Sequence, residues 1–255
     1  MNRQAQAVIL FLVGVAVLRA GFTDLYLRYV KAGLQPLLLL AGVVLIAAAA
    51  ATLWYGRRRP RTADGDEPEQ HERHEGHEGH EGGHVHREPR VSWLLVLPLV
   101  ALILVAPPAL GSYSAMRAGT ALQEAPWGYP KLPAGDPLRL ELADYAGRAV
   151  YDHGRSLGDR HVKLTGFLAL DENGTAYLVR MTLNCCAADA QPVKVGLSGE
   201  LPPVLRPDTW LEVTGTYTGQ QVKDPVNDGV IPFLKATEAR PVKAPRDPYD
   251  ESLNG

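Results

Sequence analysis

The sequence predicts a membrane-anchored α+β protein, in which three N-terminal transmembrane helices precede an all-β domain that forms an OB-like small barrel. Three apolar stretches in the first half each approach the roughly 20 residues that a helix needs to cross hydrocarbon. The second half alternates polar and apolar residues in short runs between turn residues, which is typical of strands. The expected parts are two transmembrane helices at 1–55, a histidine-rich loop at 56–90, a third transmembrane helix at 91–111, a linker at 112–135 and the β domain at 136–255.

The apolar stretches are Ala5–Phe22, Leu34–Tyr55 and Val91–Leu110. The second carries no charge, and Pro36 lies where the start of a helix tolerates proline. A cleaved signal peptide is the alternative for the first stretch, but Arg19 interrupts the region where small residues would prepare a cleavage site. We therefore expect an uncleaved first span.

Basic residues are distributed unevenly between the loops, and loops rich in Lys and Arg remain cytoplasmic. The loop between the first two spans carries only Arg28 and Lys31. The next loop is more basic, with Arg57, Arg58, Arg59, Arg61, Arg87 and Arg90. We expect a multi-pass protein with residues 56–90 in the cytoplasm and the C-terminal domain outside, where disulfides can persist.

The expected cytoplasmic loop holds six of the eight histidines, namely His71, His74, His77, His80, His84 and His86. Imidazole is a good ligand for zinc and other divalent transition metals, and short His-rich tracts are a compositional sign of metal binding. Interleaved glycines oppose a stable helix, so we expect a flexible tract that wraps around an ion. The alternative is a solvated acidic spacer.

The β domain is expected to contain about five strands, with the "DENG" turn joining the first two. No long amphipathic helical pattern is expected between the strands. Gly166 and Gly215 lie where a small barrel would bend, which favours a closed OB-like barrel over an open sandwich. After Leu110 there are fifteen Lys and Arg against eighteen Asp and Glu. This balance lacks the basic footprint of a nucleic-acid-binding domain.

Cys185 and Cys186 are the only cysteines of the chain. Consecutive Cα atoms lie about 3.8 Å apart, closer than the ~4.4–6.8 Å of an ordinary disulfide. A turn after the strand would let the sulfurs converge, with Asp189 adding a carboxylate ligand or bonding backbone N–H groups. Three interpretations stay open: a site for a soft metal ion formed by Cys185, Cys186 and Asp189, a redox-labile pair, or buried structural thiols. His153 and His161, the other two histidines, are expected to be surface residues.

The motifs "LTGFL", "RMTLNCCAADAQPV", "DTWLEVTGTY", "IPFLKA" and "PRDPYD", together with the three spans and the His-rich loop, resemble the YcgQ-like family of bacterial membrane proteins. The resemblance covers nearly the whole chain. It implies a bacterial cell-membrane protein that acts beside a multi-span permease of the YraQ-like type. It carries over Cys185, Cys186, Ala187, Ala188 and Asp189 as signature positions and supplies no catalytic residues.

These observations lead to one functional expectation and two alternatives. We expect a non-enzymatic accessory subunit of a permease, linked to transport or homeostasis of divalent metal ions. No "GxSxG" elbow or recognisable Cys–His motif indicates a hydrolase. The alternatives are an extracytoplasmic thiol-redox or metal-sensing membrane protein that uses the cysteine pair, and an envelope scaffold without a ligand.

Overall fold

The computed structural model describes residues 3–58, 108–125, 127–202, 204 and 206–249. The chain divides into two compact units. The first contains Met1–Phe22 and Pro36–Ala106, and the second combines Thr23–Gln35 with Pro107–Gly255. A short loop near the N-terminus therefore belongs to the same unit as the C-terminal domain.

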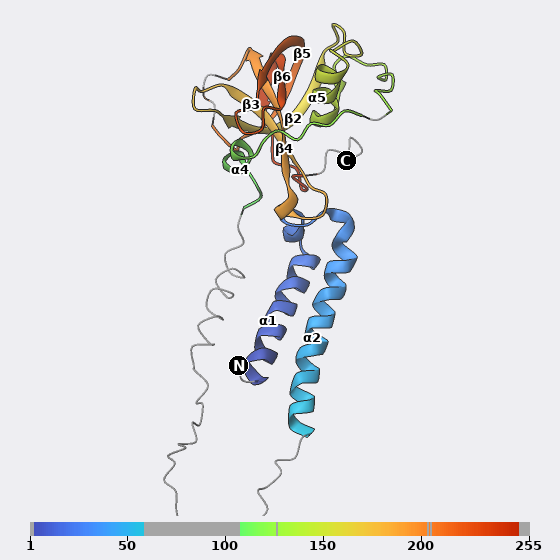
Figure 1. Ribbon diagram of the computed structural model, residues 1–255, viewed down its shortest axis with the longest axis vertical. Helices are drawn as coiled ribbons and strands as arrows, with labels where there is room; N and C mark the ends of the chain where they lie inside the picture. Colours follow the sequence, from blue (N-terminus) through green and yellow to red (C-terminus); the bar gives the residue numbers. More distant parts are fainter. Residues whose placement is uncertain (1–2, 59–107, 126, 203, 205, 250–255) are drawn as a thin grey trace, which may run out of the picture. The chain divides into compact units, whose positions relative to one another are not determined.

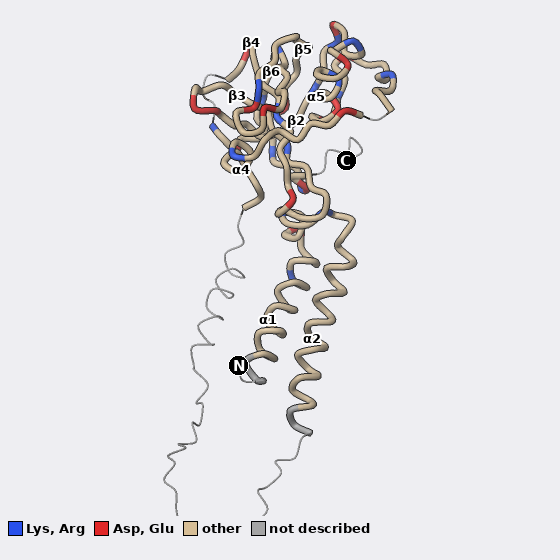
Figure 2. Tube along the Cα trace, in the orientation of Figure 1, with Lys and Arg blue, Asp and Glu red and all other residues tan. Residues whose placement is uncertain are grey.

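The first unit contains α1 (Arg3–Phe22) and α2 (Gln35–Arg58). Figure 2 shows that Lys, Arg, Asp and Glu are nearly absent from both helices and gather in the second unit. The helices approach closely at glycines: a Cβ on Gly14 would lie 2.7 Å from Ile46, and one on Gly42 would lie 2.8 Å from Leu18. Small residues permit such close packing of apolar helices.

The three predicted spans are supported only in part. Among the described residues, one helix, Ala32–Tyr55, is long and apolar enough to cross a membrane, and this composition also suits a signal sequence. The first predicted span corresponds to Gln6–Phe22, which is apolar but shorter. The third, apart from its last residues, lies outside the described residues, as does the His-rich loop.

The second unit contains five strands that close into a barrel (Figure 1). They are β2 (Val162–Leu170), β3 (Ala176–Thr182), β4 (Gln191–Gly199), β5 (Trp210–Lys223) and β6 (Val230–Pro241). The order is β2-β3-β4-β6-β5, and β5 pairs again with β2. β4 and β6 are parallel, and the other pairs in the ring are antiparallel. The closed barrel is confirmed and the open sandwich is wrong.

Turn and bend residues of the barrel lie where the sequence predicted them. Asp171 Oδ1 accepts hydrogen bonds from the backbone N–H of Asn173 at 2.9 Å and of Thr175 at 2.7 Å. These bonds hold the "DENG" turn, in which Gly174 has a φ of 81° that suits glycine. Gly215 lies at a break in the β5–β6 register, and a Cβ there would collide with the Lys235 carbonyl oxygen.

The prediction of a purely β domain is wrong, because α5 (Leu142–Tyr151) packs against β2, β3, β4 and β6. One face of α5 is fully buried, with Leu142, Tyr145, Ala146 and Ala149 at helical spacing. The Tyr145 hydroxyl donates to the Phe233 carbonyl at 2.7 Å. The two-residue strand β1 (Leu138–Arg139) precedes α5 and pairs in parallel with β2. The amphipathic helical pattern is present in "LADYAGRA", but a helix of ten residues is too short to give the long helical pattern that the sequence analysis looked for.

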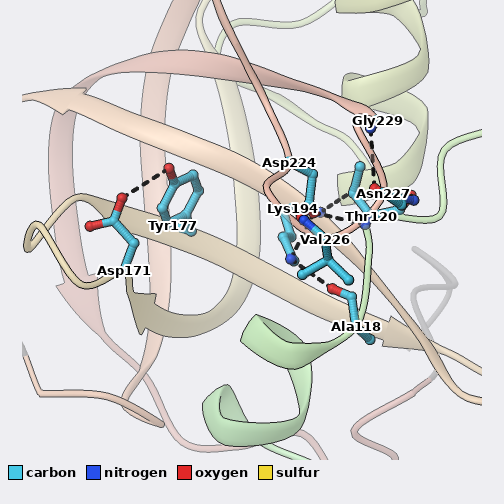
Figure 3. Close-up of polar contacts among 9 residues, drawn as sticks. All are labelled: Ala118, Thr120, Asp171, Tyr177, Lys194, Asp224, Val226, Asn227 and Gly229. Atoms are coloured by element: carbon cyan, nitrogen blue, oxygen red, sulfur yellow. Dashed lines mark hydrogen bonds and ion pairs between the residues drawn. The ribbon is translucent and has the colours of Figure 1, made fainter.

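The segment expected to be a linker contains α4 (Ser112–Arg117) and is fixed to the barrel by a buried ion pair. Lys194 Nζ lies 2.7 Å from Asp224 Oδ2, and both side chains are almost fully buried. The Lys194 ammonium also donates to the Ala118 carbonyl at 2.8 Å, and the Thr120 amide donates to Asp224 Oδ2 at 2.8 Å. In Figure 3 the Lys194 ammonium and the Thr120 amide meet the Asp224 carboxylate, and the Ala118 carbonyl meets the Lys194 ammonium. These bonds hold the segment to the barrel at Ala118 and Thr120.

Candidate functional site

The cysteine pair lies in the turn between β3 and β4, and the Asp189 carboxylate holds this turn. Its oxygens accept the backbone N–H groups of Asn184 at 3.2 Å, Cys185 at 2.9 Å and Cys186 at 3.3 Å. The amide of Asp189 in turn bonds the Cys186 side chain, which completes a capping box around η4 (Ala187–Asp189). Two roles were predicted for Asp189, a metal ligand and an acceptor of backbone N–H groups. The hydrogen bonds of the turn show the second role.

Hydrogen bonds in this turn raise the pKa of one of the two thiols, that of Cys185. Both cysteines are free, Cys185 exposed and Cys186 half-buried. The hydrogen bond to Asp189, followed by one to Cys186, raises the pKa of the Cys185 thiol to about 11. The backbone N–H of Cys185 is the largest cause that lowers the pKa of the Asp189 carboxyl. A thiol is a much poorer metal ligand and nucleophile than a thiolate, so the raised pKa of Cys185 opposes both chemistries at this cysteine.

The predicted metal ligands are only partly brought together. Cys185, Cys186 and Asp189 are neighbours, but within the described residues no three His, Cys, Asp or Glu side chains have an arrangement that could hold a metal ion. His161 lies beside Asp136, with Nδ1 3.2 Å from Oδ1, and His153 is exposed. The six histidines of the 71–86 tract lie outside the described residues. Metal binding therefore stays a prediction.

The backbone of the cysteine turn makes a contact that the sequence did not predict, with the loop Thr23–Gln35, called here the 23–35 loop. Val30 forms an antiparallel β-bridge with Cys186. The Lys31 amide donates to the Cys185 carbonyl at 3.1 Å, and the Ala187 amide donates to the Tyr29 carbonyl at 2.7 Å. The cysteine turn therefore acts as a short strand edge that binds the loop between α1 and α2.

The last described residues clamp the same loop from another direction. The Tyr249 hydroxyl donates to the Arg28 carbonyl at 3.0 Å and accepts the Leu110 amide, also at 3.0 Å. Arg246 forms an ion pair with Asp24, and this pairing lowers the pKa of the Asp24 carboxyl. Inside the loop, η1 (Asp24–Arg28) buries Tyr26 and Leu27. Three distant chain segments thus meet at one tyrosine hydroxyl.

Sequence reasoning missed the 23–35 loop as a functional element. It also singled out "PRDPYD" only as part of a resemblance, without a role for Arg246 or Tyr249. A signal was present in "TDLYLRYVKAGL", which places the apolar runs "LYL" and "YV" between charged residues. Such residues in a connecting loop often pack on a neighbouring domain, but the sequence does not say which one.

Comparison with known proteins identifies the C-terminal domain only. A DUF1980 C-terminal domain is found at residues 134–250. No significant match was found among curated proteins or among solved structures. The matched region begins before β1 and includes the whole barrel, α5, the cysteine turn and the clamp residues Arg246 and Tyr249.

Proposed function

We propose that this protein is an accessory subunit of a bacterial membrane permease, with an extracytoplasmic OB-like barrel that packs on or gates the permease. The observation that carries the proposal is that the 23–35 loop and the barrel form one compact unit. The loop contacts the cysteine turn and the tail, and in the chain it is joined to an apolar helix at each end. These contacts support a barrel that acts at the membrane surface.

The contact between the 23–35 loop and the barrel supports three membrane spans, because the loop and the barrel must then lie on the same side of the membrane. If α2 crosses the membrane, the 23–35 loop lies on one side and residue 58 on the other. The barrel contacts the loop, so this topology requires one further span in the sequence between α2 and the barrel. The apolar stretch Val91–Leu110 is the segment able to form it. The basic loop 56–90 then lies in the cytoplasm and the barrel outside.

The charged groups of the barrel support a scaffold role. Glu212, which is 7% exposed, lies 3.2 Å from Arg139 and 3.3 Å from Lys163, and also pairs with Arg240. These four residues come from β1, β2, β5 and β6. With Lys194 and Asp224, they tie separate segments together. We infer that these ion pairs help to specify how the segments of the barrel domain assemble.

The topology can be tested directly, because the native chain has only two cysteines. In intact cells, a membrane-impermeant maleimide should label Cys185, which is exposed. As a control, Ala63→Cys in a Cys185→Ser/Cys186→Ser background should react only after permeabilisation. Labelling of the native pair only in permeabilised cells would overturn the external placement.

The partner can be tested by purifying tagged full-length protein in mild detergents and identifying what accompanies it by mass spectrometry. A stoichiometric multi-span permease of the YraQ-like type is expected. The double variant Arg246→Ala/Tyr249→Phe should recover less of it, whereas the matched control Arg155→Ala/Tyr113→Phe should not. Recovery of the protein alone in every detergent would contradict the proposal that it is a permease subunit.

For the substrate we propose a divalent transition metal ion, because of the histidine tract. Zinc titration of the full chain should lose most of its signal when residues 71–86 are deleted, and little in Cys185→Ser/Cys186→Ser. The second candidate, a thiol-redox or metal-sensing role, is favoured by the exposure of Cys185. It predicts the opposite result: cysteine-dependent zinc binding, or loss of free thiols in protein prepared without reductant.

A further inference from the structure

The second unit contains an open groove of about 690 Å³ that none of the functions above uses. Its walls come from four parts of the unit: the 23–35 loop, residues 108–114, the tail at 244–248, and strands β2 and β5 with the turn before β5. The lining is mainly apolar, with Leu110, Phe167 and Trp210. The rings of Phe167 and Trp210 pack edge-to-face, with centroids 5.9 Å apart. The volume lies within the range of small-molecule sites.

Some of the charged side chains that line this groove already have a hydrogen-bond or ion-pair partner, and one has none within the described part of the chain. Asp208 Oδ1 accepts the Ser112 amide at 2.6 Å, and Arg246 is paired with Asp24. The exposed Arg28 guanidinium makes no hydrogen bond or ion pair with any residue that the structure describes, and only its carbonyl is held, by Tyr249. The groove therefore combines an apolar wall with one arginine available to an anion.

In the sequence, two walls of this groove lie close to the segments that we propose to span the membrane. Arg28 follows the end of α1 by only a few residues, and Leu110 ends the third apolar stretch. Both residues contact the same Tyr249 hydroxyl. A chain that leaves the hydrocarbon core first crosses a headgroup layer of roughly 5–7 Å. Tyrosine and tryptophan are enriched at that depth, and Tyr113 and Trp210 line the groove.

We propose that this groove binds a phospholipid, with the phosphate on the Arg28 guanidinium and an acyl chain against Phe167 and Trp210. Arginine suits this role because its planar fork matches phosphate geometry. The inference rests on the membrane location proposed above but not on the permease partner. A bound lipid would connect the 23–35 loop, which Tyr249 joins to Leu110, with Phe167 and Trp210 of the barrel.

The test uses full-length protein in nanodiscs with Trp210 as the single tryptophan, through Trp54→Phe, Trp93→Phe and Trp127→Phe. Phosphatidylglycerol with brominated acyl chains should quench Trp210, and brominated diacylglycerol, which lacks the phosphate, should quench it much less. Arg28→Gln should raise the lipid fraction needed for half-quenching roughly fivefold, the effect of a partly exposed charged contact. Arg155→Gln, an exposed arginine away from the groove, should change nothing.

Three outcomes would overturn the proposal. Absence of quenching would show that no acyl chain reaches Trp210. Equal quenching by diacylglycerol, or no effect of Arg28→Gln, would remove the phosphate contact. Reversal of quenching by millimolar inorganic phosphate would assign the arginine to free phosphate instead of a lipid. Because the protein is tested alone, failure of the permease assignment leaves each of these results interpretable.

Discussion

The hydroxyl of Tyr249 donates a hydrogen bond to the carbonyl of Arg28, 221 residues earlier in the chain, at 3.0 Å. The same oxygen accepts the amide of Leu110. One side chain near the C-terminus therefore joins the loop after α1 to the segment that leads into the barrel. This contact and the β-bridge at Cys186 make the 23–35 loop part of the C-terminal unit.

Replacing Tyr249 by phenylalanine should loosen the loop without unfolding the barrel. The variant keeps the ring but removes two hydrogen bonds, each worth about 0.5–1.5 kcal/mol. Amide exchange at residues 24–31 should become roughly tenfold faster in hydrogen-exchange mass spectrometry, with little change in β2–β6. Tyr113→Phe is the matched control, because that exposed tyrosine hydroxyl makes no hydrogen bond to a described residue. Equal protection of the loop in both variants would show that the clamp is dispensable.

Asp189→Asn should disturb both the cysteine turn and the titration of its thiol. The carboxylate accepts three backbone N–H groups, and an amide has only one oxygen to replace them. Removing the charged acceptor should also lower the pKa of Cys185 from about 11 toward its ordinary value. The measurement is the rate of thiol alkylation against pH, in a Cys186→Ser background. An unchanged midpoint would mean that Asp189 does not set the thiol pKa.

The Cys185 thiol should also make stability depend on alkaline pH. Its pKa is about 11 in the folded protein and 9.0 for an ordinary thiol. The folded state therefore holds the proton more tightly, and this contribution is complete below pH 9 and is lost as the pH rises through 11. The melting temperature should fall more steeply between pH 9 and 11 in the native protein than in Cys185→Ser. Parallel curves for the two proteins would contradict the shift.

Breaking the Lys194–Asp224 pair should cost much more than changing a surface pair. Asp224→Asn leaves a buried ammonium without its counter-charge, which typically costs about 3–5 kcal/mol. For a protein of this size, that corresponds to a loss of roughly 10 °C in melting temperature. Arg155→Gln, which removes an exposed pair with Asp152, should shift it by less than about 2 °C.

A double variant separates the charge effect from the loss of hydrogen bonds. Lys194→Gln/Asp224→Asn removes both charges and keeps polar groups near Ala118 and Thr120. Its destabilisation should be smaller than the sum of the two single changes, since neither partner is left as an isolated buried ion. Additive effects would indicate that the two residues do not interact in the folded protein.

The local pattern of residue types was sufficient to predict most of the barrel strands. Alternation of polar and apolar residues identifies the strands, and Asp171 with Gly174 identifies a hairpin turn from residue type alone. The helix α5 was missed because ten residues of mixed polarity next to glycine- and proline-rich sequence give a short amphipathic signal. Its assignment depends on burial of Tyr145 and its neighbours against several strands.

The sequence by itself determined the apolar helices, the strands, the position of the cysteine pair in a turn, and the ability of Asp189 to hold that turn, because each depends on residues within a few positions of one another. Only the tertiary structure decided that the barrel closes through β2 and β5, that Lys194 and Asp224 form a buried pair, and that the cysteine turn binds the 23–35 loop. These are contacts between segments far apart in the chain. Almost every residue type has the same backbone N–H and C=O groups. A backbone hydrogen bond such as that from Lys31 N–H to the Cys185 carbonyl therefore cannot be recognised from residue types, and only the folded structure reveals it.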